Sequence, residues 1–92
     1  MIENHTEIER TSSVRYRVIG DETVVVIQHS AELLVLNEIG GRVVQLLDQP
    51  MTLASLVEAL QDEYEVDPTI LRKDIVDYIL ELETDGVVGF HA

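Results

Sequence analysis

Cysteine and tryptophan are absent from this 92-residue chain, and proline occurs only twice. Without cysteine, the chain can form no disulfide, thiol nucleophile or cysteine-based metal site. Glycine is also sparse, and 46% of the residues are hydrophobic, which argues against global disorder. The length leaves room for one domain with a single modest core.

Long apolar runs are missing as well. The longest candidates, residues 24–27 and 33–36, have the length of strands and not of membrane spans. Residues 1–13 are polar and acidic and contain no apolar segment of signal-peptide type. We therefore expect a soluble, cytoplasmic protein with a flexible, solvated tail over residues 1–13 and one folded domain over residues 14–90.

Basic residues are scarce: six stand against eighteen acidic ones, for a net charge of −12. A surface of that sign repels phosphate backbones and anionic lipids, so nucleic-acid and membrane partners are not expected. Acidic charge also keeps a small protein soluble, which accounts for most of the excess.

Patterns that carry catalysis are not found. The three histidines lie on the predicted tail, a loop and the C-terminus, and the chain has neither a glycine-rich phosphate loop nor a zinc-protease motif. Asp74, Asp77 and Glu81 have helical spacing that could suggest a weak metal site, but a solvated acidic face explains them better. We expect no enzymatic activity, no metal and no cofactor.

Three strands are predicted in the first half of the folded part. Residues 14–19 alternate between apolar and polar side chains, which is typical of a half-buried strand. A turn at residues 20–22 leads into the β-branched run 23–28, and a third apolar run covers residues 32–36. The first two runs predict a hairpin.

Three helices are predicted in the second half, from their capping residues. Asn37 and Thr52 are N-cap candidates ahead of apolar stripes, and Asp67 followed by Pro68 is a strong start signal. The third helix is expected to run to about Thr84, with Gly86 placed to end it. Strands followed by helices indicate an α+β fold. We predict a winged helix-turn-helix-like arrangement, a three-stranded antiparallel sheet followed by three helices.

The third helix has more apolar surface than one core contact needs. At about 100° per residue, Leu71, Ile75, Tyr78 and Leu82 form one stripe, with Ile79 beside them. A second apolar strip holds Val76 and Leu80, edged by Arg72 and Lys73. These two residues either pack under other elements or line a groove for an extended peptide, whose acidic residue would pair with Arg72 or Lys73.

The third strand supports the groove interpretation. Leu33, Leu34, Val35 and Leu36 are apolar on both faces, as in a strand that is covered on both sides or lies in a cleft. At a sheet edge, its free backbone groups could pair with an added peptide strand. An ordinary central strand would show the same pattern.

The residues from the third strand onward resemble the PqqD family. The matching stretches are Leu34-x-Leu36-Asn37-Glu38-x-Gly40, then Val43-Val44-x-Leu46-Leu47, the helix capped by Thr52, and Lys73-Asp74-Ile75-Val76-x-Tyr78-Ile79-x-x-Leu82-x-x-x-Gly86-Val87. The resemblance covers about residues 14–88. Features of lasso-peptide members are missing: those members often carry a glycine and an aromatic residue just before the Leu-Asn pair and a tryptophan in the first helix, and the residues here are Ala31, Glu32, Leu33 and Val44.

The resemblance implies a function as well as a fold. Such proteins bind the leader segment of a ribosomally made precursor peptide, as a strand added between the third strand and the third helix. They deliver it to a modifying enzyme, a radical SAM protein or a leader peptidase. The predicted peptide-binding residues here are Leu33, Leu34, Val35, Leu36, Arg72, Lys73, Val76 and Leu80.

Two other functions remain open from the sequence. Winged-helix folds often bind DNA, but the third helix offers only two bases against at least four acids. The second is an oligomerising adaptor that pairs through its own strand edge, whose self-association would compete with peptide binding or replace it. For the leader-binding function, we expect a monomer or a weak homodimer.

Overall fold

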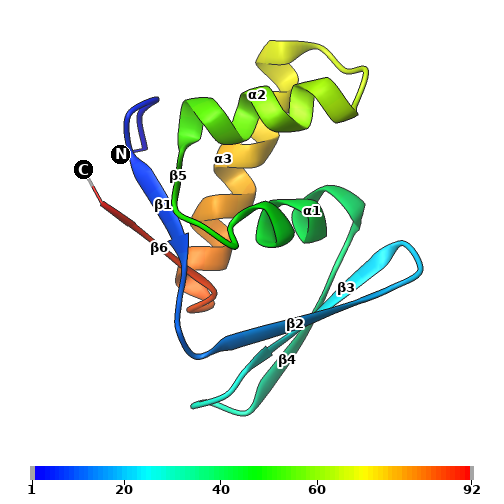
Figure 1. Cartoon of the computed structure of the whole chain (residues 1–92), viewed down its shortest axis with the longest axis vertical. Helices are drawn as coiled ribbons and strands as arrows, with labels where there is room; N and C mark the ends of the chain where they lie inside the picture. The colour runs from blue at the N-terminus through cyan, green and yellow to red at the C-terminus, as the bar shows by residue number, and fades with distance from the viewer. Residues whose placement is uncertain (1, 92) are drawn as a thin grey trace.

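The computed structural model describes residues 2–91 and contains, within them, two small antiparallel sheets and three helices (Figure 1). One sheet has the order β2-β3-β4, from β2 (Val14–Ile19), β3 (Glu22–Ile27) and β4 (Glu32–Leu36). The other has the order β5-β1-β6, from β1 (Glu7–Arg10), β5 (Met51–Thr52) and β6 (Val88–His91). The helices are α1 (Glu38–Leu46), α2 (Leu53–Glu63) and α3 (Pro68–Thr84).

The predicted sheet and its hairpin are confirmed. In the register of β2 and β3, Val14 lies opposite Ile27 and Ile19 lies opposite Glu22. The turn between them uses Gly20 with a φ of 63°, a left-handed conformation that favours glycine. The strand β4 follows on the other side of β3, so the sequence order is also the spatial order and β4 is an edge strand.

The predicted helix starts are confirmed by their caps. The side chains of Asn37, Thr52 and Asp67 accept hydrogen bonds from backbone N–H groups in the first turns of α1, α2 and α3. The helix α3 ends at Thr84, and Gly86 follows with a φ of 84°. Within residues 2–91, none of these helices combines the length and apolar composition needed to cross a membrane.

The N-terminal segment is not the solvated tail that the sequence predicted. Residues 7–10 form β1, which pairs with both β5 and β6. Ile8 is completely buried, and the carbonyls of Asn4 and Thr6 accept hydrogen bonds from the first backbone N–H groups of α2. The domain boundary expected at residue 14 is therefore corrected: the folded part begins at Ile2 within the described residues, and Met1 lies outside them.

The core lies between the inner face of the β2-β3-β4 sheet and the helices (Figure 1). From the sheet it takes Val25 and Ile27, both almost fully buried, and α1 packs over them with Val43 and Val44. The helices α2 and α3 and the strands β1 and β6 complete it. The α+β class and the sequence of a sheet followed by three helices are confirmed, with a second sheet formed by β1 and β6 from the two ends of the chain and β5 from its middle.

Candidate functional site

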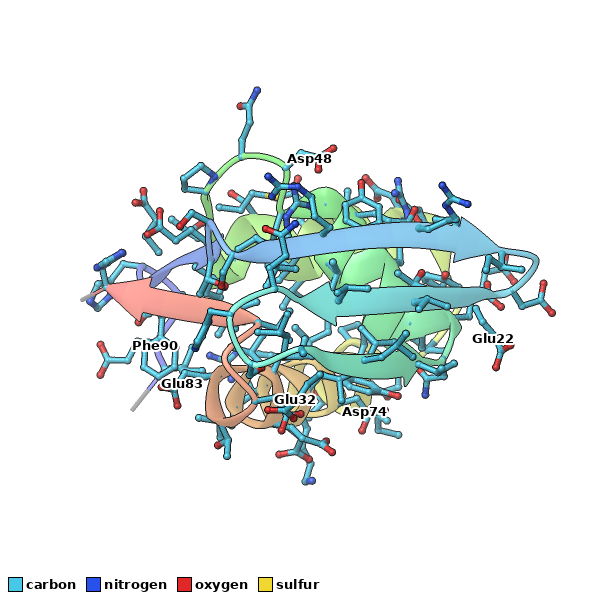
Figure 2. The ribbon with its side chains drawn as sticks, turned by 90° about the horizontal axis from the view of Figure 1, so that it is seen from below. Glu22, Glu32, Asp48, Asp74, Glu83 and Phe90 are labelled. Atoms are coloured by element: carbon cyan, nitrogen blue, oxygen red, sulfur yellow. The ribbon has the colours of Figure 1, made fainter. Side chains whose placement is uncertain are left out.

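The free edge of β4 lies beside α3, and a cavity of about 340 Å³ separates the two elements. Figure 2 shows this arrangement from below, with β2, β3, β4 and α3 following one another across the view. The cavity is lined from both sides by Leu34, Val35, Leu36, Asn37, Tyr78, Glu81, Leu82 and Asp85. An edge strand beside an open cavity leaves backbone donors and acceptors available to another chain.

The side chains of β4 divide between two faces, because alternate residues of a strand point to opposite sides. Leu34 and Leu36 are half-buried and pack against the core, so they form the apolar floor of the cavity. Leu33 and Val35 point the other way and are 62% and 56% exposed. Of the four predicted β4 residues, Leu33 is the one that does not line the cavity.

The opposite wall is the acidic side of α3. A second hollow of about 350 Å³ continues along the helix and is lined by Ile39, Asp74, Asp77, Tyr78 and Glu81. Because Tyr78 and Glu81 line both hollows, we treat the two as one feature, the β4–α3 groove. The sequence predicted these carboxylates on a solvent-exposed face, and Asp74, Asp77 and Glu81 are indeed exposed; the same face of α3 borders the groove.

Negative charge dominates the β4–α3 groove. Its α3 wall carries Asp74, Asp77, Glu81 and Asp85, and the basic group nearest to them is Lys73, whose Nζ lies 2.8 Å from the Asp77 carboxylate. That hydrogen bond raises the pKa of Lys73. Within residues 2–91, no group of three potential metal ligands is close enough to hold an ion. The wall therefore acts as an array of exposed carboxylates and suits cationic side chains.

A contact between α1 and α3 lies where the two hollows of the groove meet, at Tyr78. Asn37 caps α1 by accepting a hydrogen bond from Gly40 N at 2.9 Å, and its side-chain amide donates to the phenol oxygen of Tyr78. Gly40 permits this approach, since a Cβ there would lie 3.1 Å from the Tyr78 ring. The sequence assigned Tyr78 to the core stripe. A phenol hydroxyl needs a polar partner, and that need is the signal that could have placed it at the edge.

The four predicted α3 residues do not line the groove. Arg72 donates two hydrogen bonds to Asn4, Val76 packs against the core, and Leu80 is 44% exposed on the side away from it. Lys73 is nearest, at the outer rim through Asp77. The neighbours of α3 differ from those that the sequence suggested: the N-terminal segment, read as a tail, lies on the Arg72 side, and β4 lies on the Tyr78 side. The part of these four residues in peptide binding stays a prediction.

Solved structures share this fold. TbiB1 in complex with the TbiA(beta) leader peptide aligns with a TM-score of 0.81 at 24% identity, over 91% of this chain and 98% of that one. Lasso peptide synthetase B1 complexed with the leader peptide aligns with a TM-score of 0.74 at 25% identity, over 89% of this chain and 96% of that one. The third is the solution structure of the PqqD truncation of Methylobacterium extorquens PqqCD, which is described as a stand-alone recognition element. It aligns with a TM-score of 0.79 at 20% identity, over 97% of this chain and 95% of that one.

The family of this chain follows from a comparison of its sequence with protein-family models. A search of curated protein sequences finds no match. The family model described as coenzyme PQQ synthesis protein D (PqqD) matches residues 22–88, which span β3 to the start of β6 and include both walls of the groove. Because this match covers well over half of the sequence, the chain belongs to the PqqD family.

Proposed function

We propose that this protein binds the leader segment of a ribosomally made precursor peptide, as a strand added to β4 in the β4–α3 groove. The observation that carries the proposal is the free edge of β4 beside a cavity with an apolar floor. Backbone hydrogen bonds to β4 would provide affinity, and side-chain contacts would provide specificity. Two structural neighbours are complexes with leader peptides, which supports the same use of the groove here.

The groove also indicates the chemistry of the bound segment. Alternate side chains of an added strand would lie on the floor made by Leu34 and Leu36, and apolar residues fit there. Side chains that reach α3 would meet Glu81 and Asp85, so lysine or arginine fits this wall. The sequence had suggested an acidic leader residue beside Arg72 or Lys73, and the placement of the carboxylates favours the opposite sign.

We further propose that the protein is itself non-catalytic and cytoplasmic, and that it presents the leader to a modifying enzyme such as a radical SAM protein or a leader peptidase. DNA binding is the natural rival for a winged-helix-like fold. A recognition helix would need basic side chains directed at the DNA phosphates, whereas the solvent-exposed side of α3 along the groove carries acidic residues. Steeply salt-dependent binding to duplex DNA would favour that rival.

An amide chemical-shift titration of the labelled protein tests the proposal. The probe is the leader peptide of the precursor encoded beside the gene, with a scrambled peptide of equal composition as control. We expect shifts concentrated on residues 32–37 and 74–85. Shifts confined to other elements would show that the leader binds outside the β4–α3 groove. The absence of shifts at high excess of the leader would contradict leader binding.

A further inference from the structure

The outer face of the β2-β3-β4 sheet, turned away from the core, is unusually apolar. It is formed by Arg15, Arg17 and Ile19 of β2, Glu22, Val24 and Val26 of β3, and Leu33 and Val35 of β4, with Glu22 at the end of the sheet opposite Ile19. We call this set the outer face. Ile19, Leu33 and Val35 are each more than half exposed. A sheet with one side on the core usually carries polar residues on the other.

These residues form a continuous surface, because the strand register brings them together. Arg17, Val24 and Val35 form one cross-strand row, and Arg15, Val26 and Leu33 form the next. A hollow of about 310 Å³ lies over the part of the surface between β2 and β3. Isolated exposed aliphatic residues are common and need no explanation, but a contiguous patch marks an interaction surface.

The two arginines on the outer face have no carboxylate partner within residues 2–91. Three of the six basic residues are paired: Arg10 with Asp48, Arg42 with Glu63 and Lys73 with Asp77. By contrast, Arg15 donates to main-chain carbonyls of Ser12 and Val14, and Arg17 makes no side-chain hydrogen bond in this part of the chain.

The charges favour one type of occupant. In a chain of net charge −12, the outer face carries two guanidinium groups that form no ion pair within residues 2–91, beside exposed aliphatic side chains. A second copy paired face to face about a two-fold axis would bring four arginines together, and this repulsion disfavours self-association. A partner with carboxylates around an apolar centre complements the surface instead.

We propose that the outer face docks a partner protein whose contact surface presents apolar side chains between carboxylates, and that this partner is the modifying enzyme. The identification of the partner rests on the proposed function. A leader added at the free edge of β4 would extend the same sheet, so its outward side chains would lie next to Leu33 and Val35. An enzyme docked on the outer face would therefore contact the domain and the leader together.

The experiment compares two affinities on the same variants. The purified modifying enzyme encoded beside the gene is titrated into the wild type, the double variant Arg15→Glu/Arg17→Glu and the double variant Val24→Ser/Val26→Ser, whose two valines lie on the central strand β3 and not on the leader-binding edge. We expect enzyme affinity to fall at least tenfold in both, and leader affinity to change less than twofold. The double variant Arg15→Lys/Arg17→Lys keeps the charge and should retain most enzyme affinity. The control variant Ile70→Ser replaces an exposed aliphatic residue of α3 outside the outer face, and it should leave enzyme affinity unaltered.

Three results would overturn the inference: no binding of the enzyme to the wild type, enzyme affinity that the outer-face variants leave unchanged, or a wild-type dimer that the same variants dissociate in sedimentation equilibrium. Failure of the proposed function is a separate result, because it appears as a wild type that binds no leader. Folding of each variant is checked by its amide spectrum, so a loss of enzyme affinity in a correctly folded variant reports on the surface itself.

Discussion

Asn37 donates a hydrogen bond from its side-chain amide to the phenol oxygen of Tyr78, and with it the first turn of α1 is attached to the middle of α3. The same side chain accepts from Gly40 N, so one residue both caps α1 and fixes the wall of the β4–α3 groove. Asn37 directly follows β4, and the strand therefore enters the groove at a fixed position relative to α3.

The two roles of Asn37 can be separated by substitution. Asn37→Ala removes the cap and should lower the free energy of unfolding by about 0.5–2 kcal/mol. Asn37→Asp keeps an oxygen for Gly40 N and adds a charge favourable at a helix N-terminus, so its stability should stay close to that of the wild type. Urea unfolding followed by circular dichroism measures both. Equal losses in the two variants would show that the cap is not the stabilising contact.

The close approach of α1 to β3 depends on Gly41. A Cβ at this position would overlap the Thr23 hydroxyl and lie 2.7 Å from Thr23 Cβ, and Thr23 is buried in the central strand. Gly41→Ala should therefore destabilise the protein by about 1–3 kcal/mol, despite the better helix propensity of alanine. Gly89→Ala, which meets open space, is the control and should change the midpoint of thermal unfolding little.

Elements with local signals were predictable from the sequence. The caps Asn37, Thr52 and Asp67 set the helix starts, and Gly86 marks the end of α3. The hairpin of β2 and β3 follows from alternation and a two-residue turn, which act over short distances. In each case neighbouring residues determine the structure, so no knowledge of distant segments is required.

Strand β1 and the groove side of α3 could not be predicted, because both depend on distant pairing. Ile8 is the single large apolar residue of β1, and its partners Met51 and Phe90 lie far along the chain. Once β1 is missed, nothing in the sequence shows that the Arg72 side of α3 is occupied. Without β1, the sequence shows no partner for Val76, so the predicted peptide-binding surface lies on a different side of α3 from the β4–α3 groove.

The N-terminal strand should be essential to stability. Ile8→Ala removes a fully buried side chain where β1 meets the core, and we expect a loss of about 2–5 kcal/mol in the free energy of unfolding. Ile70→Ala makes the same chemical change at a position that is 61% exposed, and it should cost less than about 0.5 kcal/mol. Denaturant unfolding of both variants checks this, and similar small losses would mean that residues 7–10 contribute little.

Acid stability should depend on the pair formed by Arg10 and Asp48. A hydrogen bond from Arg10 Nη1, 2.8 Å long, lowers the pKa of Asp48, and Tyr16 contributes a second donor. Because the folded-state pKa is depressed, this contribution to stability is present above the ordinary aspartate pKa and is lost as the pH falls through the folded value. In Arg10→Gln the Asp48 pKa should rise towards its ordinary value. Carboxyl-carbon NMR titration measures it directly, and an unchanged pKa would assign the shift to another cause.

The acidic wall of the groove should select the charge of the bound peptide. Glu81→Lys changes the net charge by the same amount as Glu83→Lys, but the two positions lie about 200° apart around α3, and only Glu81 lines the groove. For a leader with a basic residue facing α3, Glu81→Lys should weaken binding about three- to tenfold, the effect of reversing a partly exposed ion pair. Glu83→Lys should change it less than twofold. Fluorescence anisotropy with a labelled leader at two salt concentrations makes the comparison. Equal effects of both variants would point to long-range attraction, whereas tighter binding by Glu81→Lys would show that the leader presents acidic residues to α3.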